Sequence, residues 1–249
     1  MHQGHPVPGP SIYEERLKFG TVDPHGKLWF GSMKQGKPAY GRLFSFSPFY
    51  WPYLKTHLHQ QGVRPHVQNG NNLGNGVVWF PHNLDYNRLY FNDARKLRIE
   101  MYFCDIIHQD VEGAGHVVFN LNQHRGDHIP DHARIGRFTV DNRGWMWLPI
   151  IGGSGILEFN PYENEVGRFI EIPSSRGVSA CVFGGHEMRT LYATTIGPLS
   201  HEIRAPGDDS GAVFSVGRLG EGVWGFLGSE FVLTTAGPSQ PLHPPHGTH

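Results

Sequence analysis

Asn75 has the clearest capacity for metal chemistry, and it lies near the start of a stretch, 74–93, in which two apolar runs flank a polar turn. Its side-chain amide supplies a neutral carbonyl oxygen, and hard oxygen ligands suit Ca²⁺, Mg²⁺ and Mn²⁺. The dipeptide Asn75-Gly76 is also a favoured turn pair, because both residue types tolerate a positive φ. Two interpretations therefore stay open, a metal ligand and a turn residue, and the residues alone favour the turn.

Histidine spacing raises the separate question of a zinc site. His124, His128 and His132 recur at four-residue intervals, which would align their rings on one face of a helix. Pro130 breaks such a helix, and no cysteine or acidic side chain completes a tetrahedral zinc set. The sequence therefore predicts a solvated loop here.

The charge balance is close to neutral, since 21 basic and 22 acidic side chains give a formal charge of −1. This balance offers no attraction for nucleic acid or an anionic membrane, and no apolar run approaches the roughly 20 residues that a membrane helix needs. Cys104 and Cys181 are too few for a disulfide framework, and the N-terminus has no apolar signal core. We therefore expect a cytoplasmic protein that binds neither nucleic acid nor membrane.

Short β-branched and aromatic runs alternate with turn clusters along the whole chain. Aromatic residues recur at the second strand of four similar units, 61, 57 and 45 residues apart, at Trp29, Tyr90, Trp147 and Tyr192. A repeat of roughly 40–50 residues with about four strands is typical of a β-propeller. The sequence predicts an all-β fold, a β-propeller with about four visible blades, and a β-sandwich is the alternative. We expect one domain over residues 1–236 and a disordered Pro/His-rich tail over 237–249.

Four motifs carry a resemblance to a known family. In chain order they are residues 75–79, 89–93, 139–147 and 181–194, and residues 22–33 upstream also fit. Their order and spacing resemble the SMP-30/gluconolactonase/regucalcin family over residues 16–216. The resemblance implies a six-bladed propeller that binds a divalent cation in its channel and hydrolyses sugar lactones. It also implies that the N-terminal blade and much of the second are absent, and with them a glutamate metal ligand.

The resemblance assigns roles residue by residue. Asn75 matches a metal ligand of the family, and Asp131 resembles the aspartate that binds the metal and acts as the catalytic base. A second alignment places Gly136 at that position, which would remove the base. Arg16 matches a substrate-binding arginine or is a solvated charge beside neighbouring glutamates. Lys18, two residues later, replaces an asparagine of the same substrate-binding segment.

Together these assignments predict a metal-dependent lactonase or esterase for small sugar lactones. One divalent cation would polarise the carbonyl while Asp131 takes a proton from the attacking water. The expected cation is Ca²⁺, and Mg²⁺, Mn²⁺ and Zn²⁺ are the alternatives. The alternative is a non-catalytic propeller that binds calcium or a protein, because the glutamate is missing and Lys18 and Lys37 replace family residues. A chain with about four blades would also leave sheet faces unpaired, which predicts a homo-oligomer.

Overall fold

The computed structural model describes residues 15–34, 43–46, 63–67, 74–81, 86–105, 110–175, 177–198 and 202–231. Within these ranges the chain forms β-strands and two short 3₁₀ helices, η3 (Leu121–His124) and η4 (His186–Met188). None of the described helices is long and apolar enough to cross a membrane. Lys37 and the predicted tail at 237–249 lie outside the described residues.

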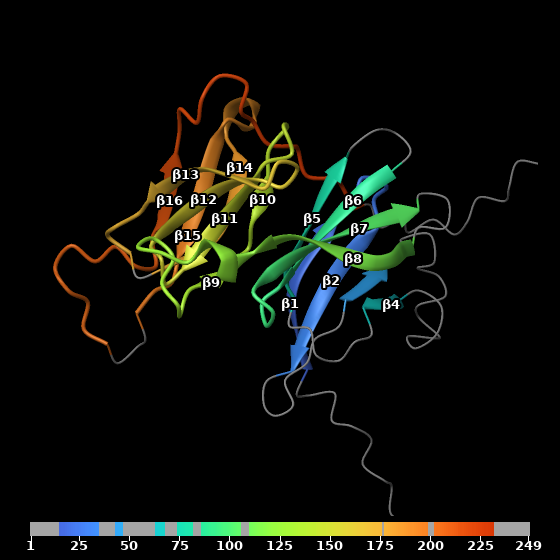
Figure 1. The fold of residues 1–249 in the computed structure, drawn as a ribbon, viewed down its shortest axis with the longest axis horizontal. Helices are drawn as coiled ribbons and strands as arrows, with labels where there is room; N and C mark the ends of the chain where they lie inside the picture. Colours follow the sequence, from blue (N-terminus) through green and yellow to red (C-terminus); the bar gives the residue numbers. More distant parts are fainter. Residues whose placement is uncertain are drawn as a thin grey trace, which may run out of the picture.

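The described strands form four antiparallel sheets that follow one another along the chain (Figure 1). The first contains β1 (Glu15–Val22), β2 (Leu28–Lys34), β3 (Leu43–Phe46) and β4 (Val63–Val67). The second contains β5 (Gly74–Pro81), β6 (Tyr86–Asp93), β7 (Arg98–Asp105) and β8 (Asp110–Asn120). The third contains β10 (Thr139–Val140), β11 (Met146–Ile151), β12 (Gly155–Asn160) and β13 (Glu165–Glu171), and β9 (Arg134–Ile135) pairs with β11. The fourth contains β14 (Val178–Gly184), β15 (Thr190–Thr195) and β16 (Val213–Val216).

Apart from the two-residue strand β9, which pairs with β11, every strand pairs with its neighbour in the sequence, so each sheet is an up-and-down meander. The four recurring aromatic residues lie on the second strand of each meander: β2, β6, β11 and β15. The predicted all-β class and the repeat of four units are thereby confirmed. The units are successive blades and not the two stacked sheets of a sandwich.

The turn between β1 and β2 explains the recurring pattern of aspartate, glycine and tryptophan. Asp23 is buried, and its Oδ1 accepts hydrogen bonds from the backbone nitrogens of His25 (2.8 Å) and Lys27 (2.9 Å). Its Oδ2 accepts a bond from Trp29 Nε1 at 2.9 Å. Gly26 adopts a φ of 80°, which glycine takes without strain. One carboxylate therefore shapes the turn and orients the aromatic side chain that fills the blade.

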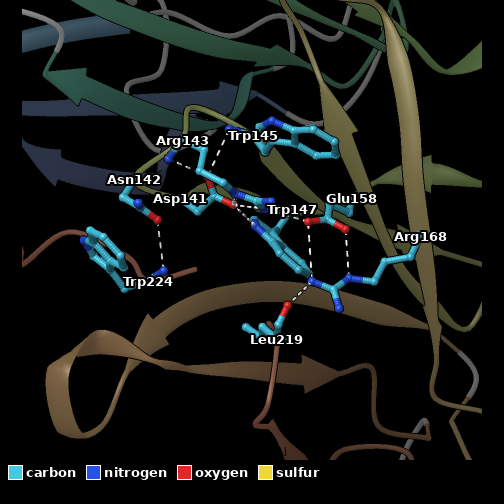
Figure 2. Close-up of polar contacts among 9 residues, drawn as sticks. All are labelled: Asp141, Asn142, Arg143, Trp145, Trp147, Glu158, Arg168, Leu219 and Trp224. Atoms are coloured by element: carbon cyan, nitrogen blue, oxygen red, sulfur yellow. Dashed lines mark hydrogen bonds and ion pairs between the residues drawn. The ribbon is translucent and has the colours of Figure 1, made fainter. Parts of the chain in front are cut away.

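The third blade repeats this arrangement and extends it with charged side chains (Figure 2). Asp141 accepts bonds from the backbone nitrogens of Arg143 and Trp145 and, through Oδ2, from Trp147 Nε1 at 3.0 Å. The Arg143 guanidinium lies 2.6 Å from Asp141 Oδ2 and 2.7 Å from Glu158 Oε1. Both carboxylates are buried. Because an unpaired buried charge is strongly destabilising, the blade depends on these contacts.

The hydrophobic core lies between consecutive blades. One cluster joins the first and second blades and includes Trp29, Trp79 and Leu89. A second joins the second and third and includes Ile99, Phe119 and Phe159, and a third joins the third and fourth and includes Trp147, Phe183 and Leu191. No such cluster of described residues joins the fourth blade to the first.

The innermost strands approach one another where side chains are small. Arg137, just before β10, forms a parallel bridge with Ala180 of β14. Gly76 of β5 lies so close to the third blade that a Cβ there would be 3.8 Å from Arg137 Cγ. A Cβ on Gly74 would be 2.9 Å from the ring of Phe19 in β1. These approaches bring the starts of the four innermost strands to one end of a shared channel.

Residues 223–231, which we call the closing segment, run from the fourth blade toward the first at the other end of the channel (red in Figure 1). Trp224 exchanges two hydrogen bonds with Asn142, at 2.9 and 3.0 Å, and Figure 2 shows this pair. The same figure shows Arg168 bridging Glu158 and the backbone oxygen of Leu219, just upstream. Phe226 packs on Phe80 of the second blade, with ring centroids 5.5 Å apart. Phe231 packs on Phe46 of the first blade, with ring centroids 5.8 Å apart. The segment therefore contacts all four blades.

Candidate functional site

The four innermost strands border a cavity of about 510 Å³, a size typical of small-molecule sites. Each blade contributes to its wall, and the contributing residues include Thr21, Val78, Thr139 and Val182. Residues 226–229 of the closing segment complete the wall. Among the described residues that line it, Arg137 is the one charged side chain, and no carboxylate is present.

Asn75 lies at the start of β5, where the pairing with β6 is irregular between Gly74 and Val77. The positive φ of this bulge, 144°, belongs to Gly76, so the Asn-Gly pair shapes a bulge and not a hairpin turn. Asn75 Nδ2 donates to the backbone oxygen of Ile135 at 3.0 Å. Within the described chain no donor pairs with its Oδ1, the atom that would bind a cation.

Asn92 of β6 was not predicted as a site residue, yet it supports the same peptide. It is fully buried, and its Nδ2 donates to the backbone oxygens of Gly136 at 2.8 Å and Ile135 at 3.4 Å. Two amides of the second blade therefore fix the segment that leads into β10. No residue pattern pointed to Asn92, because a single Asn inside an apolar strand has many structural uses.

The structure separates the two alignments of the predicted catalytic base. Asp131 lies in an exposed turn, and it does not line the cavity or contact Asn75. Gly136 directly precedes the cavity-lining Arg137, and a Cβ there would be 2.4 Å from Ser179 O and 3.0 Å from Pro149 Cβ. The backbone of the fourth blade thus occupies the space that a side chain at Gly136 would need. The role of Asp131 stays a prediction.

We call Arg16, Lys18, Arg134 and Arg137 the cationic cluster, because the charges of the three arginines act on the Lys18 amine. The Arg137 guanidinium donates to the backbone oxygen of Lys18, 119 residues away in the chain. Burial lowers the pKa of the Lys18 amine, and the charges of Arg137, Arg16 and Arg134 lower it further. In the part of the chain that the structure describes, none of the four forms an ion pair with a carboxylate. Among the described residues, no carboxylate therefore compensates the positive charge of the cluster.

The described residues of this channel do not by themselves supply the ligands of a divalent cation. Asn75 offers one side-chain oxygen, Gly136 offers none, and the charged groups nearby are those of the cationic cluster. Calcium takes six to eight oxygen ligands in typical sites, and neighbouring cations repel it. Among the described residues no group of three or more His, Cys, Asp or Glu side chains could hold a metal ion.

Two of the three evenly spaced histidines, His124 and His128, stack on different aromatic side chains. The His124 ring stacks on Phe119 with centroids 4.9 Å apart, and burial lowers its pKa. His128 stacks on Phe169, and its Nδ1 lies 3.3 Å from Glu171 Oε1. The loop prediction was therefore wrong for His124, which ends η3 and packs against an aromatic side chain of the core.

Comparison with known proteins identifies the family. The sequence model described as SMP-30/Gluconolactonase/LRE-like region matches residues 13–197, well over half of the chain. The chain belongs to this family. Its resemblance to the family, inferred from four motifs, is confirmed.

Two curated relatives share the chain's sequence at modest identity. The pentonolactonase XacC of Haloferax volcanii is 26% identical over 204 residues, which cover 80% of this chain and 60% of XacC. YvrE of Bacillus subtilis, provisionally named a sugar lactone lactonase, is 26% identical over 189 residues, which cover 75% of this chain and 56% of YvrE. This chain of the SMP-30/Gluconolactonase/LRE-like family therefore spans less than two thirds of the length of either relative.

Solved structures show the fold. A luciferin-regenerating enzyme superposes with a TM-score of 0.69 at 25% identity, covering 89% of this chain and 66% of that one. Regucalcin of Agrobacterium tumefaciens, described as a calcium-binding protein, gives a TM-score of 0.68 at 16% identity. This superposition also covers 89% of this chain and 66% of the other. The fold of this chain is thus that of the SMP-30/regucalcin β-propellers.

Proposed function

We propose that this family member binds a small lactone in its channel and hydrolyses it. The observation that carries the proposal is the cavity bordered by all four blades, with Arg137 as its charged side chain. The reaction class is supported by the relatives, of which one is a pentonolactonase and another is provisionally named a sugar lactone lactonase.

Arg137 is well placed to contact the carbonyl of a bound lactone. A guanidinium has five N–H donors, and the described contacts of this one use a single partner, the backbone oxygen of Lys18. A donor aimed at an oxygen that gains negative charge in the transition state lowers the reaction barrier. Val78 and Val182 would contact the apolar part of the lactone ring, and we assign Arg16 and Lys18 to substrate binding at the entrance.

Arg137→Met is expected to reduce kcat/KM for aldonolactones by about 100-fold, the effect of removing one such donor. The change in kcat/KM is measured by following the hydrolysis of a lactone panel with a pH indicator. The assay is run in chelator and with added Ca²⁺, Mg²⁺, Mn²⁺ or Zn²⁺. Arg218→Met is the matched control, because Arg218 is exposed and makes no side-chain contact among the described residues. Equal rates in the two variants would contradict the assignment.

The predicted base and metal ligand are tested in the same assay. Asp131 lies in an exposed turn, so Asp131→Asn is expected to leave the fold intact. Loss of hydrolysis with retained lactone binding would assign Asp131 as the base. Hydrolysis that disappears both in chelator and in Asn75→Ala would support the metal-dependent mechanism, whereas hydrolysis unaffected by either would exclude it.

The crowding at Gly136 favours a second candidate, a propeller that binds the lactone without hydrolysing it. No carboxylate of the described chain lines the cavity, and Gly136 has no room for one. This candidate predicts that calorimetry detects lactone binding, weakened by Arg137→Met, while no turnover occurs under any metal condition. Turnover in chelator would exclude it.

A further inference from the structure

We propose that the cationic cluster binds an anionic group, a carboxylate or phosphate carried by a sugar-sized ligand. The inference rests on the proposed function, because the ligand enters the same channel. It narrows the expected ligand from small lactones in general to ligands that carry an anionic group. The expected ligand is a sugar acid or a phosphorylated lactone, and a neutral lactone is expected to bind more weakly. Guanidinium groups suit this role because their planar donor pairs match the oxygens of carboxylates and phosphates.

Arg137 is held in place by contacts on both sides. Its backbone nitrogen donates to Ser179 O and its backbone oxygen accepts from Cys181 N, each at 2.9 Å, which attaches it to the fourth blade. Its side chain reaches the backbone of Lys18 in the first blade. A guanidinium that is already positioned loses little conformational entropy when it binds an anion.

The neighbouring cation Arg134 belongs to the same fixed segment. Asn75 and Asn92 bind the backbone oxygens of Ile135 and Gly136, the two residues that separate Arg134 from Arg137. The second blade thus holds the stretch of the third blade from which these two cations extend. Arg16 and Lys18 approach from β1, so the cluster is assembled from two blades and held by a third.

Among the described residues the charge of the cluster has no carboxylate partner, and this points to an anion. Like charges at close range raise the free energy of the folded state unless an opposite charge is present. No carboxylate pairs with any member of the cluster in the described chain. An anionic ligand would supply the missing charge and stabilise the fold when it binds.

The cavity explains how the rest of the ligand would be held. Arg137 belongs both to the cationic cluster and to the wall of the 510 Å³ cavity. An anion bound at the cluster would therefore leave the sugar portion beside the threonines of the wall, Thr21 and Thr139. Their hydroxyls can donate to and accept from sugar hydroxyls.

Calorimetry on the full chain in chelator tests this inference with four probes: inorganic phosphate, gluconate, 6-phosphogluconate and neutral glucono-1,5-lactam, a lactone analogue that is not hydrolysed to the sugar acid. We expect gluconate or 6-phosphogluconate to bind at least about tenfold more tightly than the neutral lactam, an effect of one charge-assisted contact. Competition by inorganic phosphate shows whether the site prefers phosphate or carboxylate. Inorganic phosphate is expected to displace a sugar acid efficiently only if the site binds phosphate. Added NaCl is expected to weaken the binding.

Variants locate the binding site. Arg137→Gln and Lys18→Met are each expected to weaken anion binding by about tenfold or more. Arg218→Gln is the control, because it also removes one positive charge but at a residue with no described hydrogen bond or ion pair. This control is expected to leave anion binding unchanged. Arg137→Lys keeps the charge and is expected to give an intermediate affinity. Thermal unfolding confirms that each variant folds.

Two results would overturn the inference: sugar acids that bind no more tightly than the neutral lactam, or equal affinities in Arg137→Gln and Arg218→Gln. The inference and the proposed function fail differently. Anion binding without lactone hydrolysis would refute the proposed reaction alone. Hydrolysis of neutral lactones without anion binding would refute the anion site alone.

Discussion

Asp141→Ala is expected to lower the free energy of unfolding by about 3–5 kcal/mol, because three donors around the turn and the indole lose their acceptor. The Asp141 carboxylate is fully buried and accepts from two backbone nitrogens, from Trp147 Nε1 and from the Arg143 guanidinium. Alanine would leave the indole and both backbone donors without their partner, and each buried unpaired donor is costly. Urea unfolding followed by tryptophan fluorescence measures the loss.

Two comparisons isolate the cause. Asp23→Ala removes the same turn and indole contacts in the first blade, with no arginine paired to that carboxylate among the described residues. We expect a smaller loss there, and the difference reports the Arg143 ion pair. Asp131→Ala removes an exposed carboxylate and is expected to change stability by less than about 0.5 kcal/mol. A loss at Asp141 no larger than that at Asp131 would contradict the structural role.

Ending the chain after Gly222 is expected to cost at least about 3 kcal/mol of unfolding free energy relative to ending it after Phe231. The two chains differ only by the closing segment. Its loss uncovers Phe80, removes the buried Val223 from the core cluster of the third and fourth blades, and breaks the two Trp224–Asn142 hydrogen bonds. Urea unfolding measures the difference, and size-exclusion chromatography reports whether the shorter chain associates.

A point variant provides an independent test of the same segment. A Cβ at Gly225 would lie 2.1 Å from Phe183 Cβ, so Gly225→Ala must displace the segment or the fourth blade. Overpacking of this kind costs about 1–3 kcal/mol. Gly228→Ala is the control, because a Cβ there meets no atom within 4 Å. Equal stability of the two variants would show that the segment does not pack as described.

The repeat is the feature that sequence alone determined most completely. Trp29 and Trp147 each follow an aspartate by six residues, and the structure shows the carboxylate of that aspartate bonded to the indole in both blades. This pattern is readable because it is local, since the turn, its glycine and its aromatic residue all lie within a few positions. Local patterns also determined the meander order of the strands and the family, which both follow from the spacing of the motifs.

The candidate site was predictable only in part. Asn75 was recognised by its place before an apolar run, and it does lie at the channel, but its amide nitrogen is engaged by Ile135. Arg16 and Lys18 were assigned to the substrate from the resemblance, and they are members of the cationic cluster. Arg134, Arg137 and Asn92 were not identified, because nothing in their immediate sequence distinguishes them from other surface or strand residues.

Only the tertiary structure decided the chemistry of the channel. Arg137 reaches Lys18 across 119 residues, and the space beside Gly136 is occupied by the backbone at Ser179. Such contacts depend on how closely neighbouring blades pack, which is set by side-chain volumes at several distant positions together. The sequence by itself therefore determined the blades and their family, whereas the packing of blade against blade decided that Arg137 lines the cavity and that a side chain at Gly136 has no room.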